Sequence, residues 1–241
     1  MYTQSAQWYD ALYSFKDYKA ETDQLLALLS EKRPNAKTLL DVACGTAEHD
    51  RYLSEHYQVD GIDLEPEFIH IAAAKNRAGR YTQADMSSFD LDRTYDIILC
   101  LFSSIGYLRT LDRVGQALQC FKRHLALGGL LLVEPWFTPA SWNPEHPATM
   151  LTAEGKGEGE GWRICRMTET GQAGNLSFFT CHYLVGQGKG VKYFTEYHEL
   201  GLFTVEEMTA AFRQAGFTVT YDEAGLIGRG LYLAEDSTSP R

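Results

Sequence analysis

The first 137 residues alternate between short apolar segments and amphipathic segments, and this alternation constrains the fold more than any other feature of the chain. Thr38–Val42 is a short apolar run that ends in small residues, as fully buried strands of a parallel sheet do. Leu25, Leu28 and Leu29 give the preceding segment an apolar stripe at helical spacing. Further strands are predicted at 59–64, 80–83, 95–101 and 130–133, and helices at 49–56, 67–78 and 111–125. Strands and helices in this order form βαβ units with right-handed crossovers.

The alternation is interrupted after Trp136. Three strand-like segments, at 162–169, 176–185 and 191–203, predict an antiparallel meander, and the glycine-rich run 154–161 before them indicates a mobile turn. The first pattern then resumes with a helix that Thr204 caps, with Glu207 three residues later, and with two closing strands at 217–221 and 230–234. From residue 235 we expect a frayed tail.

We therefore predict an α/β fold with a Rossmann-like, open, mostly parallel seven-stranded sheet. Residues 1–137 and 204–241 form this domain in the prediction. Residues 138–203 form an inserted antiparallel β subdomain that covers the substrate site.

Composition narrows the range of partners. The formal net charge is −10 and no run of basic residues occurs, which argues against nucleic acid and against an anionic membrane surface. No stretch approaches the roughly 20 apolar residues that cross a bilayer, and the first residues lack the pattern of a secretory signal. The 5 cysteines are scattered without metal-ligand spacing, so we expect no metal site and a reduced, cytoplasmic protein.

The tip of the first predicted strand is the first candidate for a ligand site, because ligands of open α/β sheets bind beyond the carboxyl ends of the strands. The small residues of Asp41–Thr46, Ala43 and Gly45 among them, let backbone N–H groups approach a ligand closely. A dinucleotide needs a turn denser in glycine, and ATP needs a lysine that is absent here. The single glycine therefore disfavours NAD and ATP.

Three further strand ends carry groups that fit one cofactor. Asp63, followed by Leu64, can accept hydrogen bonds from both hydroxyls of a ribose. Asp85 can accept from an adenine amino group while Met86 packs on the ring. Leu101 begins a stretch that can line a thioether. Together with the turn, these positions predict S-adenosylmethionine as the cofactor.

The four motifs in this order resemble the class I S-adenosylmethionine-dependent methyltransferases. Longer stretches resemble the bacterial dTDP-amino-sugar N,N-dimethyltransferases of macrolide sugar biosynthesis; these stretches are 102–107, 133–136 and 228–231. The resemblance implies N-methylation of a small-molecule substrate, most simply an amino-sugar nucleotide, and it makes a homodimer through the meander an expectation. The family carries an arginine where Phe178 stands, so one phosphate anchor is expected to be missing.

The resemblance also implies roles for single residues. Tyr2 and Tyr18 belong to an N-terminal lid over the cofactor, and Tyr107 lies beside the reacting amine. His182 occupies a matching strand as a second catalytic candidate. Apart from the resemblance, His198 ranks with His182, after Tyr107, as a group that could orient the amine. The substrate-binding residues that we carry over are Glu21, Ser103 and Arg229.

Alternatives remain open at this stage. The acceptor could be another small amine or a hydroxyl, and the chain could bind the cofactor without catalysing a reaction. Alternation along a strand places Glu196 and His198 on one face. They are either a carboxylate–imidazole pair or, as we favour, part of a surface hydrogen bond.

Overall fold

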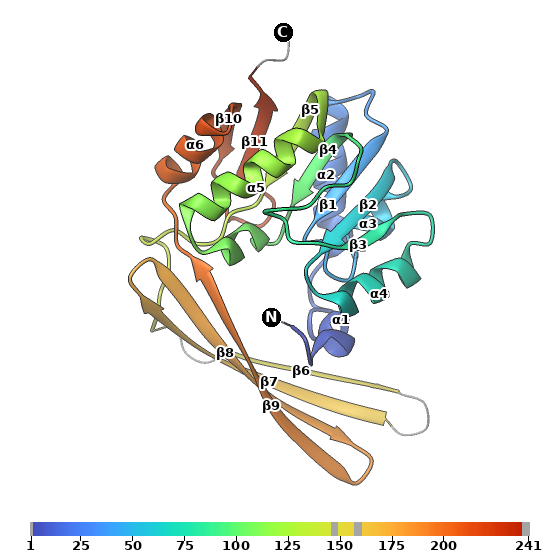
Figure 1. The fold of residues 1–241 in the computed structure, drawn as a ribbon. Helices are drawn as coiled ribbons and strands as arrows, with labels where there is room; N and C mark the ends of the chain where they lie inside the picture. Colours follow the sequence, from blue (N-terminus) through green and yellow to red (C-terminus); the bar gives the residue numbers. More distant parts are fainter. Residues whose placement is uncertain (1, 146–148, 157–160, 238–241) are drawn as a thin grey trace.

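The structure is a computed structural model that describes residues 2–145, 149–156 and 161–237. It contains two sheets, one of seven strands in the order β10-β11-β5-β4-β1-β2-β3 and one of four in the order β6-β7-β8-β9 (Figure 1). The strands are β1 (Thr38–Val42), β2 (Gln58–Asp63), β3 (Tyr81–Gln83), β4 (Tyr95–Cys100), β5 (Leu125–Val133), β6 (Thr149–Lys156), β7 (Gly161–Ala173), β8 (Leu176–Gln187), β9 (Gly190–Gly201), β10 (Phe217–Asp222) and β11 (Leu231–Asp236). The helices are η1 (Ala6–Trp8), α1 (Tyr9–Leu12), α2 (Tyr18–Lys32), α3 (Asp50–Leu53), α4 (Pro66–Lys75), η2 (Ser104–Leu108), α5 (Leu111–His124) and α6 (Val205–Gln214).

The larger sheet confirms the predicted fold class. β1 pairs in parallel with β2 and β4, β2 with β3, and β4 with β5, whereas β11 is antiparallel to both β5 and β10. Thr204 caps α6, and its capping box with Glu207 is complete. Parallel pairing brings the carboxyl ends of β1, β2 and β4 to one edge of the sheet, which is where the predicted site residues lie.

The central strands of this sheet are buried on both faces, which explains why β1, β4 and β5 are rich in apolar residues. In β4, Ile98 and Cys100 belong to a cluster with side chains of α5 and α6. Ile97 and Leu99 point to the other face and pack with Leu25 and further residues of α2. Full burial of each such side chain contributes about 1.5–3 kcal/mol relative to exposure.

Several predicted boundaries are wrong. The helix expected at 49–56 is limited to α3, and the strand expected at 130–133 begins at Leu125, with Gly128 inside it at a φ of 75°. Glu235 and Asp236 extend β11 instead of fraying, and Ser237 donates from its N–H to the carbonyl of Gly216 at 3.1 Å. The expected fraying of 238–241 concerns residues outside those described.

The smaller sheet has one strand more than predicted. β6 pairs with β7 from Thr149 opposite Thr168 to Lys156 opposite Gly161, so the glycine-rich run begins inside a strand. The centre of that run, 157–160, lies outside the described residues. β6 was not predicted because its sequence has no apolar face. In the structure its residues are either exposed or half-buried.

The N-terminal segment lies between the two sheets (Figure 1). Trp8, Leu12 and Tyr13 pack into one cluster with Ile164 and Phe194 of the smaller sheet. The segment therefore belongs to the smaller sheet's core as well as to the larger sheet's edge. In the described part of the chain, no helix is both long and apolar enough to span a membrane.

Candidate functional site

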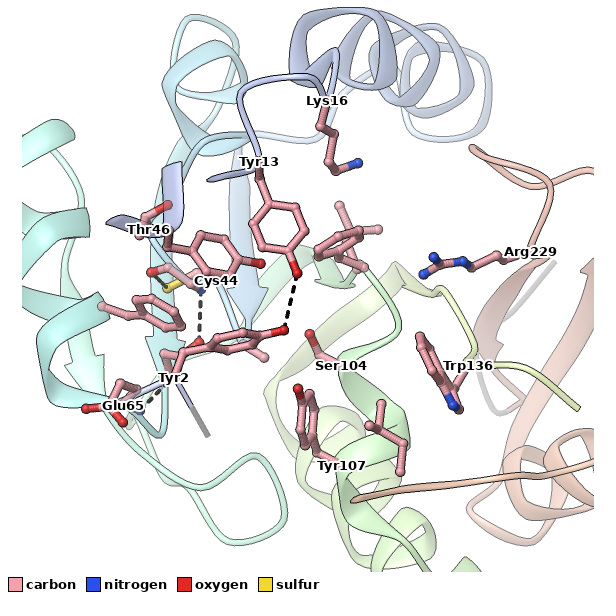
Figure 2. Close-up of a pocket in the computed structure, with 18 of the residues that line it drawn as sticks. Tyr2, Tyr13, Lys16, Cys44, Thr46, Glu65, Ser104, Tyr107, Trp136 and Arg229 are labelled. Carbon is pink, nitrogen blue, oxygen red and sulfur yellow. Dashed lines mark hydrogen bonds between the residues drawn. The ribbon is translucent and has the colours of Figure 1, made fainter. Parts of the chain in front are cut away.

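A cavity of about 700 Å³ lies at the carboxyl ends of β1, β2 and β4, below the N-terminal segment and against the smaller sheet (Figure 2). Most predicted site residues meet there. Those that line it are Tyr2, Tyr18, Glu21, Ala43, Gly45, Asp63, Leu64, Asp85, Met86, Leu101, Tyr107 and Arg229. Residues far apart in the sequence thus line one cavity.

The turn after β1 is held in an unusual backbone conformation. Ala43, Gly45 and Ala47 have φ values of 60°, 54° and 60°, in the left-handed region. For an alanine this conformation costs roughly 1–2 kcal/mol. A Cβ at Gly45 would meet no atom within 4 Å, so the turn presents bare backbone to open space. Strain of this kind is kept where the surrounding fold needs the backbone shape, as at a ligand site.

Asp63 links the end of β2 to this turn. Its carboxylate accepts from the N–H of Gly45 and from the N–H of Glu65, both at 2.9 Å. Burial raises the pKa of Asp63, while these two donors oppose the rise. A carboxylate has about four lone-pair directions, so two remain for the hydroxyls of a ribose.

Asp85 is fixed at the end of the third strand. It accepts from the N–H of Ser87 at 2.8 Å and from its hydroxyl at 2.7 Å, and Arg113 forms an ion pair with it at 2.8 Å. Burial raises the pKa of Asp85, but the Ser87 hydrogen bonds and the Arg113 charge outweigh it and lower the pKa overall. The group is therefore an ionised acceptor with a fixed orientation.

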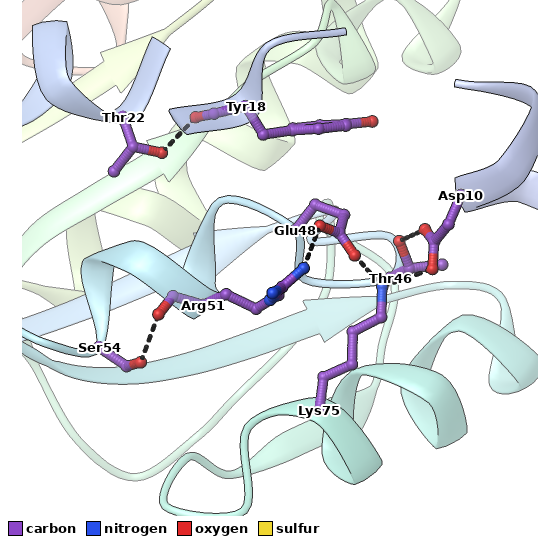
Figure 3. A network of polar contacts seen from close by, with 8 residues as sticks. All are labelled: Asp10, Tyr18, Thr22, Thr46, Glu48, Arg51, Ser54 and Lys75. Carbon is purple, nitrogen blue, oxygen red and sulfur yellow. Dashed lines mark hydrogen bonds and ion pairs between the residues drawn. The ribbon is translucent and has the colours of Figure 1, made fainter. Parts of the chain in front are cut away.

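The N-terminal segment is tied to the cofactor side of the cavity by polar contacts (Figure 3). Asp10 accepts from the hydroxyl of Thr46 at 2.5 Å and pairs with Lys75 at 2.6 Å. Lys75 also pairs with Glu48 at 2.5 Å. These contacts join α1, the turn after β1 and α4 at one point.

Glu21 reaches the cavity from α2 but is already engaged. It forms an ion pair with Lys16 and a hydrogen bond with Nε2 of His49 at 2.9 Å. Burial raises the pKa of Glu21, and the contacts with His49 and Lys16 outweigh it and lower the pKa overall. The Tyr18 ring packs edge-on to His49 at 5.0 Å.

The opposite end of the cavity is lined by hydroxyls. The Tyr107 hydroxyl lies 2.9 Å from Nδ1 of His198, and the Tyr2 hydroxyl lies 3.3 Å from that of Tyr13 (Figure 2). Burial raises the pKa of Tyr107, which is a neutral phenol at neutral pH. These hydroxyls can accept and donate hydrogen bonds without carrying charge.

Two guanidinium groups face the same end. Arg229 lies over the rings of Trp136 and Phe137, with centroids 5.3 and 5.2 Å away. Arg166, which the sequence analysis did not identify, is buried and donates from Nη1 to the Tyr13 hydroxyl at 3.0 Å. Among residues 2–145, 149–156 and 161–237, no carboxylate forms an ion pair with either arginine.

Two predicted residues do not line the cavity. His182 points to the outer face of the smaller sheet, where it contacts the Tyr193 hydroxyl at 2.7 Å and Glu169 at 3.3 Å. Its neighbour Cys181 lines the cavity instead, because successive strand residues face opposite ways. Ser103 is buried behind Arg229, from which its hydroxyl accepts at 3.1 Å.

Phe178 shares the outer face with His182 and packs against the Tyr197 ring at 6.1 Å. An arginine at position 178 would therefore point away from this cavity.

The two alternatives for Glu196 and His198 are both wrong. The two residues share a buried face of β9, but Glu196 binds Gln4 and Ser5 of the N-terminal segment and not the imidazole. Within the described ranges, no group of three or more His, Cys, Asp or Glu side chains is arranged to hold a metal ion.

The family model and the similar proteins of known function are all methyltransferases. A family model described as a methyltransferase domain matches residues 39–129. The chain is 35% identical, over 95% of its length and 96% of the relative's, to dTDP-3-amino-3,4,6-trideoxy-alpha-D-glucopyranose N,N-dimethyltransferase of Streptomyces venezuelae.

Two solved structures extend this similarity to the fold. The sugar N-methyltransferase KedS8 from Streptoalloteichus has a TM-score of 0.85 at 34% identity, covering 94% of this chain and 92% of that one. The S-adenosylmethionine-bound CalS10, an amino pentose methyltransferase from Micromonospora echinaspora, has a TM-score of 0.76 at 31% identity, covering 92% of each chain.

Proposed function

The chain belongs to the family of S-adenosylmethionine-dependent methyltransferases that includes the amino-sugar N,N-dimethyltransferases, and from this premise we propose that it methylates the amine of a nucleotide-linked amino sugar. The bare turn at Gly45 and the two remaining acceptor directions of Asp63 fit the cofactor. Asp63 would hold the ribose hydroxyls, Asp85 and Met86 the adenine, and Leu101 the thioether. Tyr2 and Tyr18 would cover the cofactor from the N-terminal segment.

The observation that carries the proposed substrate is the pair of arginines at the other end of the cavity. Arg166 and Arg229 face it without a carboxylate partner in the described part of the chain, although the whole chain carries a net charge of −10. Guanidinium groups bind the oxygens of a diphosphate with two hydrogen bonds each, and burial strengthens that attraction. An amine without an attached phosphate would leave both guanidinium groups without a diphosphate partner.

The chemistry requires mainly positioning. The cofactor supplies an activated methyl group; the amine nitrogen gives its lone pair to the new N–C bond, while the electrons of the broken C–S bond leave with sulfur. The proton of the resulting ammonium goes to water. Holding nucleophile and methyl group in line supplies most of the rate in such a displacement. Tyr107, a neutral phenol beside the cavity, is the proposed group that orients the amine.

A substrate panel tests this function. Labelled S-adenosylmethionine is incubated with 3-amino and 4-amino sugars, each as the free sugar and as its nucleoside diphosphate derivative. Label is expected in the nucleotide forms. Transfer to none of them contradicts the proposed function, and equal transfer to free sugars contradicts the diphosphate contact.

Substitutions of the two arginines test the proposed diphosphate contact directly. Arg166→Met and Arg229→Met are expected to raise KM for the nucleotide form about tenfold each, because each removes one cation from the proposed diphosphate site. Arg163 lies on the same strand as Arg166, is exposed and pairs with Glu154 of β6. Arg163→Met is therefore the matched control. That control is expected to leave KM unchanged.

Two broader properties complete the proposal. The outer face of the smaller sheet exposes large apolar side chains, which supports a homodimer through this face; they are Met150, Met167, Leu184, Val191, Tyr193 and Tyr197. Light scattering should give twice the chain mass, and Tyr193→Lys should give the monomer.

The 5 cysteines are all free, which supports a reducing cytoplasm as the compartment.

A further inference from the structure

His198 occupies an apolar stack on the inner face of β9, behind Tyr107. Its ring lies parallel to that of Phe179, with centroids 4.6 Å apart and an interplanar angle of 12°. The Tyr2 ring lies 4.4 Å away on a tilt. The side chain is buried, and its Nδ1 atom is 2.9 Å from the Tyr107 hydroxyl.

An imidazole at this position destabilises the fold relative to an apolar side chain. Its Nε2 atom is buried and has no hydrogen-bond partner among the described residues. An unpaired buried polar atom destabilises a fold, whereas an apolar side chain would fill the stack without that cost. What the imidazole adds to an apolar side chain is therefore its Nδ1 contact with Tyr107.

Neither member of this pair is charged at neutral pH. Burial, with the nearby Arg166 charge contributing, lowers the pKa of His198 to about 3. Burial raises the pKa of Tyr107 above its usual range. The pair is therefore suited to fixing a direction and unsuited to removing a proton from an ammonium ion.

We propose that His198 is a positioning residue for methyl transfer: it fixes the rotation of the Tyr107 hydroxyl, so that the phenol oxygen accepts an N–H hydrogen bond from the acceptor amine. This proposal rests on the proposed function. A hydroxyl whose O–H donates to Nδ1 presents its lone pairs in fixed directions, and the amine that donates to one of them turns its own lone pair elsewhere. A primary amine and its monomethyl product both keep an N–H for this contact.

A double-mutant cycle tests the proposal. Tyr107→Phe and His198→Leu are each expected to lower kcat about tenfold on the best nucleotide substrate, with the affinity for S-adenosylmethionine unchanged in calorimetry. The double variant should fall no further than Tyr107→Phe alone, because His198 acts through the hydroxyl that is then absent. His198→Asn places a polar atom near the Nδ1 position and is expected to recover most of the lost rate.

Stability separates this role from a structural one. His198→Leu removes the unpaired Nε2 atom, so its thermal midpoint should stay within a few degrees of the parent protein's while kcat falls. An unchanged kcat in His198→Leu, losses that add fully in the double variant, or no recovery in His198→Asn would each overturn the proposal.

A readout without turnover keeps the proposal distinct from the proposed function. If the parent protein methylates nothing in the panel, the proposed function fails. The pair is then examined by ¹⁵N resonance of the His198 ring, assigned by its loss in His198→Asn. A shifted Nδ1 signal in Tyr107→Phe supports the contact, and identical spectra overturn it.

Discussion

The carboxylate of Glu196 accepts both the backbone N–H and the hydroxyl of Ser5, at 3.0 and 2.7 Å, across 191 positions of sequence. It also accepts the N–H of Gln4 at 2.7 Å. Glu196 and Ser5 are both buried. The smaller sheet thus holds the start of the chain at one side, while Asp10 holds the same segment to the turn after β1 at the other.

Glu196→Ala should release this segment. Two backbone N–H groups and one hydroxyl lose their acceptor, and an unsatisfied buried group costs about 1–3 kcal/mol. Because the segment carries Tyr2 over the cavity and contacts the turn after β1 through Asp10, we expect affinity for S-adenosylmethionine to fall about tenfold. Hydrogen exchange over residues 2–15 should accelerate in parallel.

Glu199 is the matched control for this experiment. It lies three residues further along β9 and pairs with Arg109 at 3.1 Å, at the surface and away from the N-terminal segment. Glu199→Ala is expected to change neither exchange nor affinity, since exposed ion pairs contribute little. Equal hydrogen exchange over residues 2–15 in Glu196→Ala and Glu199→Ala would show that Glu196 does not hold the N-terminal segment in place.

The larger sheet was predictable because its strands are buried on both faces. Thr38–Val42 and Tyr95–Cys100 are short, mostly apolar runs, and Thr204 with Glu207 marks a helix start through local hydrogen bonds alone. Gly45 and Asp63 follow from the position of strand ends. All of these signals depend on neighbours in sequence.

The roles of His198, Arg166 and Glu196 could not be predicted, because they depend on which face of each strand is covered. His182 and His198 both lie on strands of the smaller sheet, and only the packing of the N-terminal segment decides that one is buried and the other faces outward. Arg166 carries no sequence signal of its own among alternating strand residues. Glu196 is recognised as a clamp only when Ser5 is beside it.

Asp63→Ala should abolish most cofactor binding. The substitution removes the acceptor of the Gly45 N–H and both proposed ribose contacts, so affinity measured by calorimetry should fall by about a hundredfold or more. Asp96 provides a control at the other end of β1, where it accepts from the N–H of Lys37 and of Thr38. Asp96→Ala should lower stability and leave cofactor affinity intact, whereas an unchanged affinity in Asp63→Ala would remove Asp63 from the site.

Gly45→Ala separates backbone strain from ligand contact. Alanine at a φ of 54° costs roughly 1–2 kcal/mol, and the new Cβ meets no protein atom within 4 Å. Gly174, with a φ of 58° in the β7–β8 turn and equally open space, matches it away from the cavity. Both variants should lose similar stability in urea unfolding, and only Gly45→Ala should weaken cofactor binding, by about tenfold. Equal binding in the two variants would show that the ligand does not approach this turn.

Asp41 and Asp50 form a buried pair of carboxyl groups beside the turn after β1. Burial raises the pKa of both, and that of Asp50 to about 6. The Oδ1 atom of Asp50 has no donor partner in the described part of the chain, while its Oδ2 atom accepts from the Tyr81 hydroxyl at 2.8 Å. Two carboxyl groups that face each other are stabilised when one of them keeps its proton and shares it with the other.

The sign of the pH effect follows from this raised pKa. Between the unfolded value near 4 and the folded value of about 6, the native state binds more protons than the unfolded state. This pair therefore makes the free energy of unfolding fall as pH rises through that window, and the raised pKa of Asp41 continues the fall above it. Asp50→Asn supplies a permanent donor without a charge, so the variant should be more stable than the parent protein at pH 8, by on the order of 1 kcal/mol.

Urea unfolding of both proteins at pH 5 and pH 8 measures the difference between them. Comparing the two proteins cancels the groups whose pKa is lowered, such as Glu21 and Asp85, since their contribution to the pH dependence is the same in each. The stability advantage of Asp50→Asn should be larger at pH 8 than at pH 5, where Asp50 of the parent protein keeps its proton. An advantage of the same size at both values would mean that the pKa of Asp50 is not raised in the folded protein.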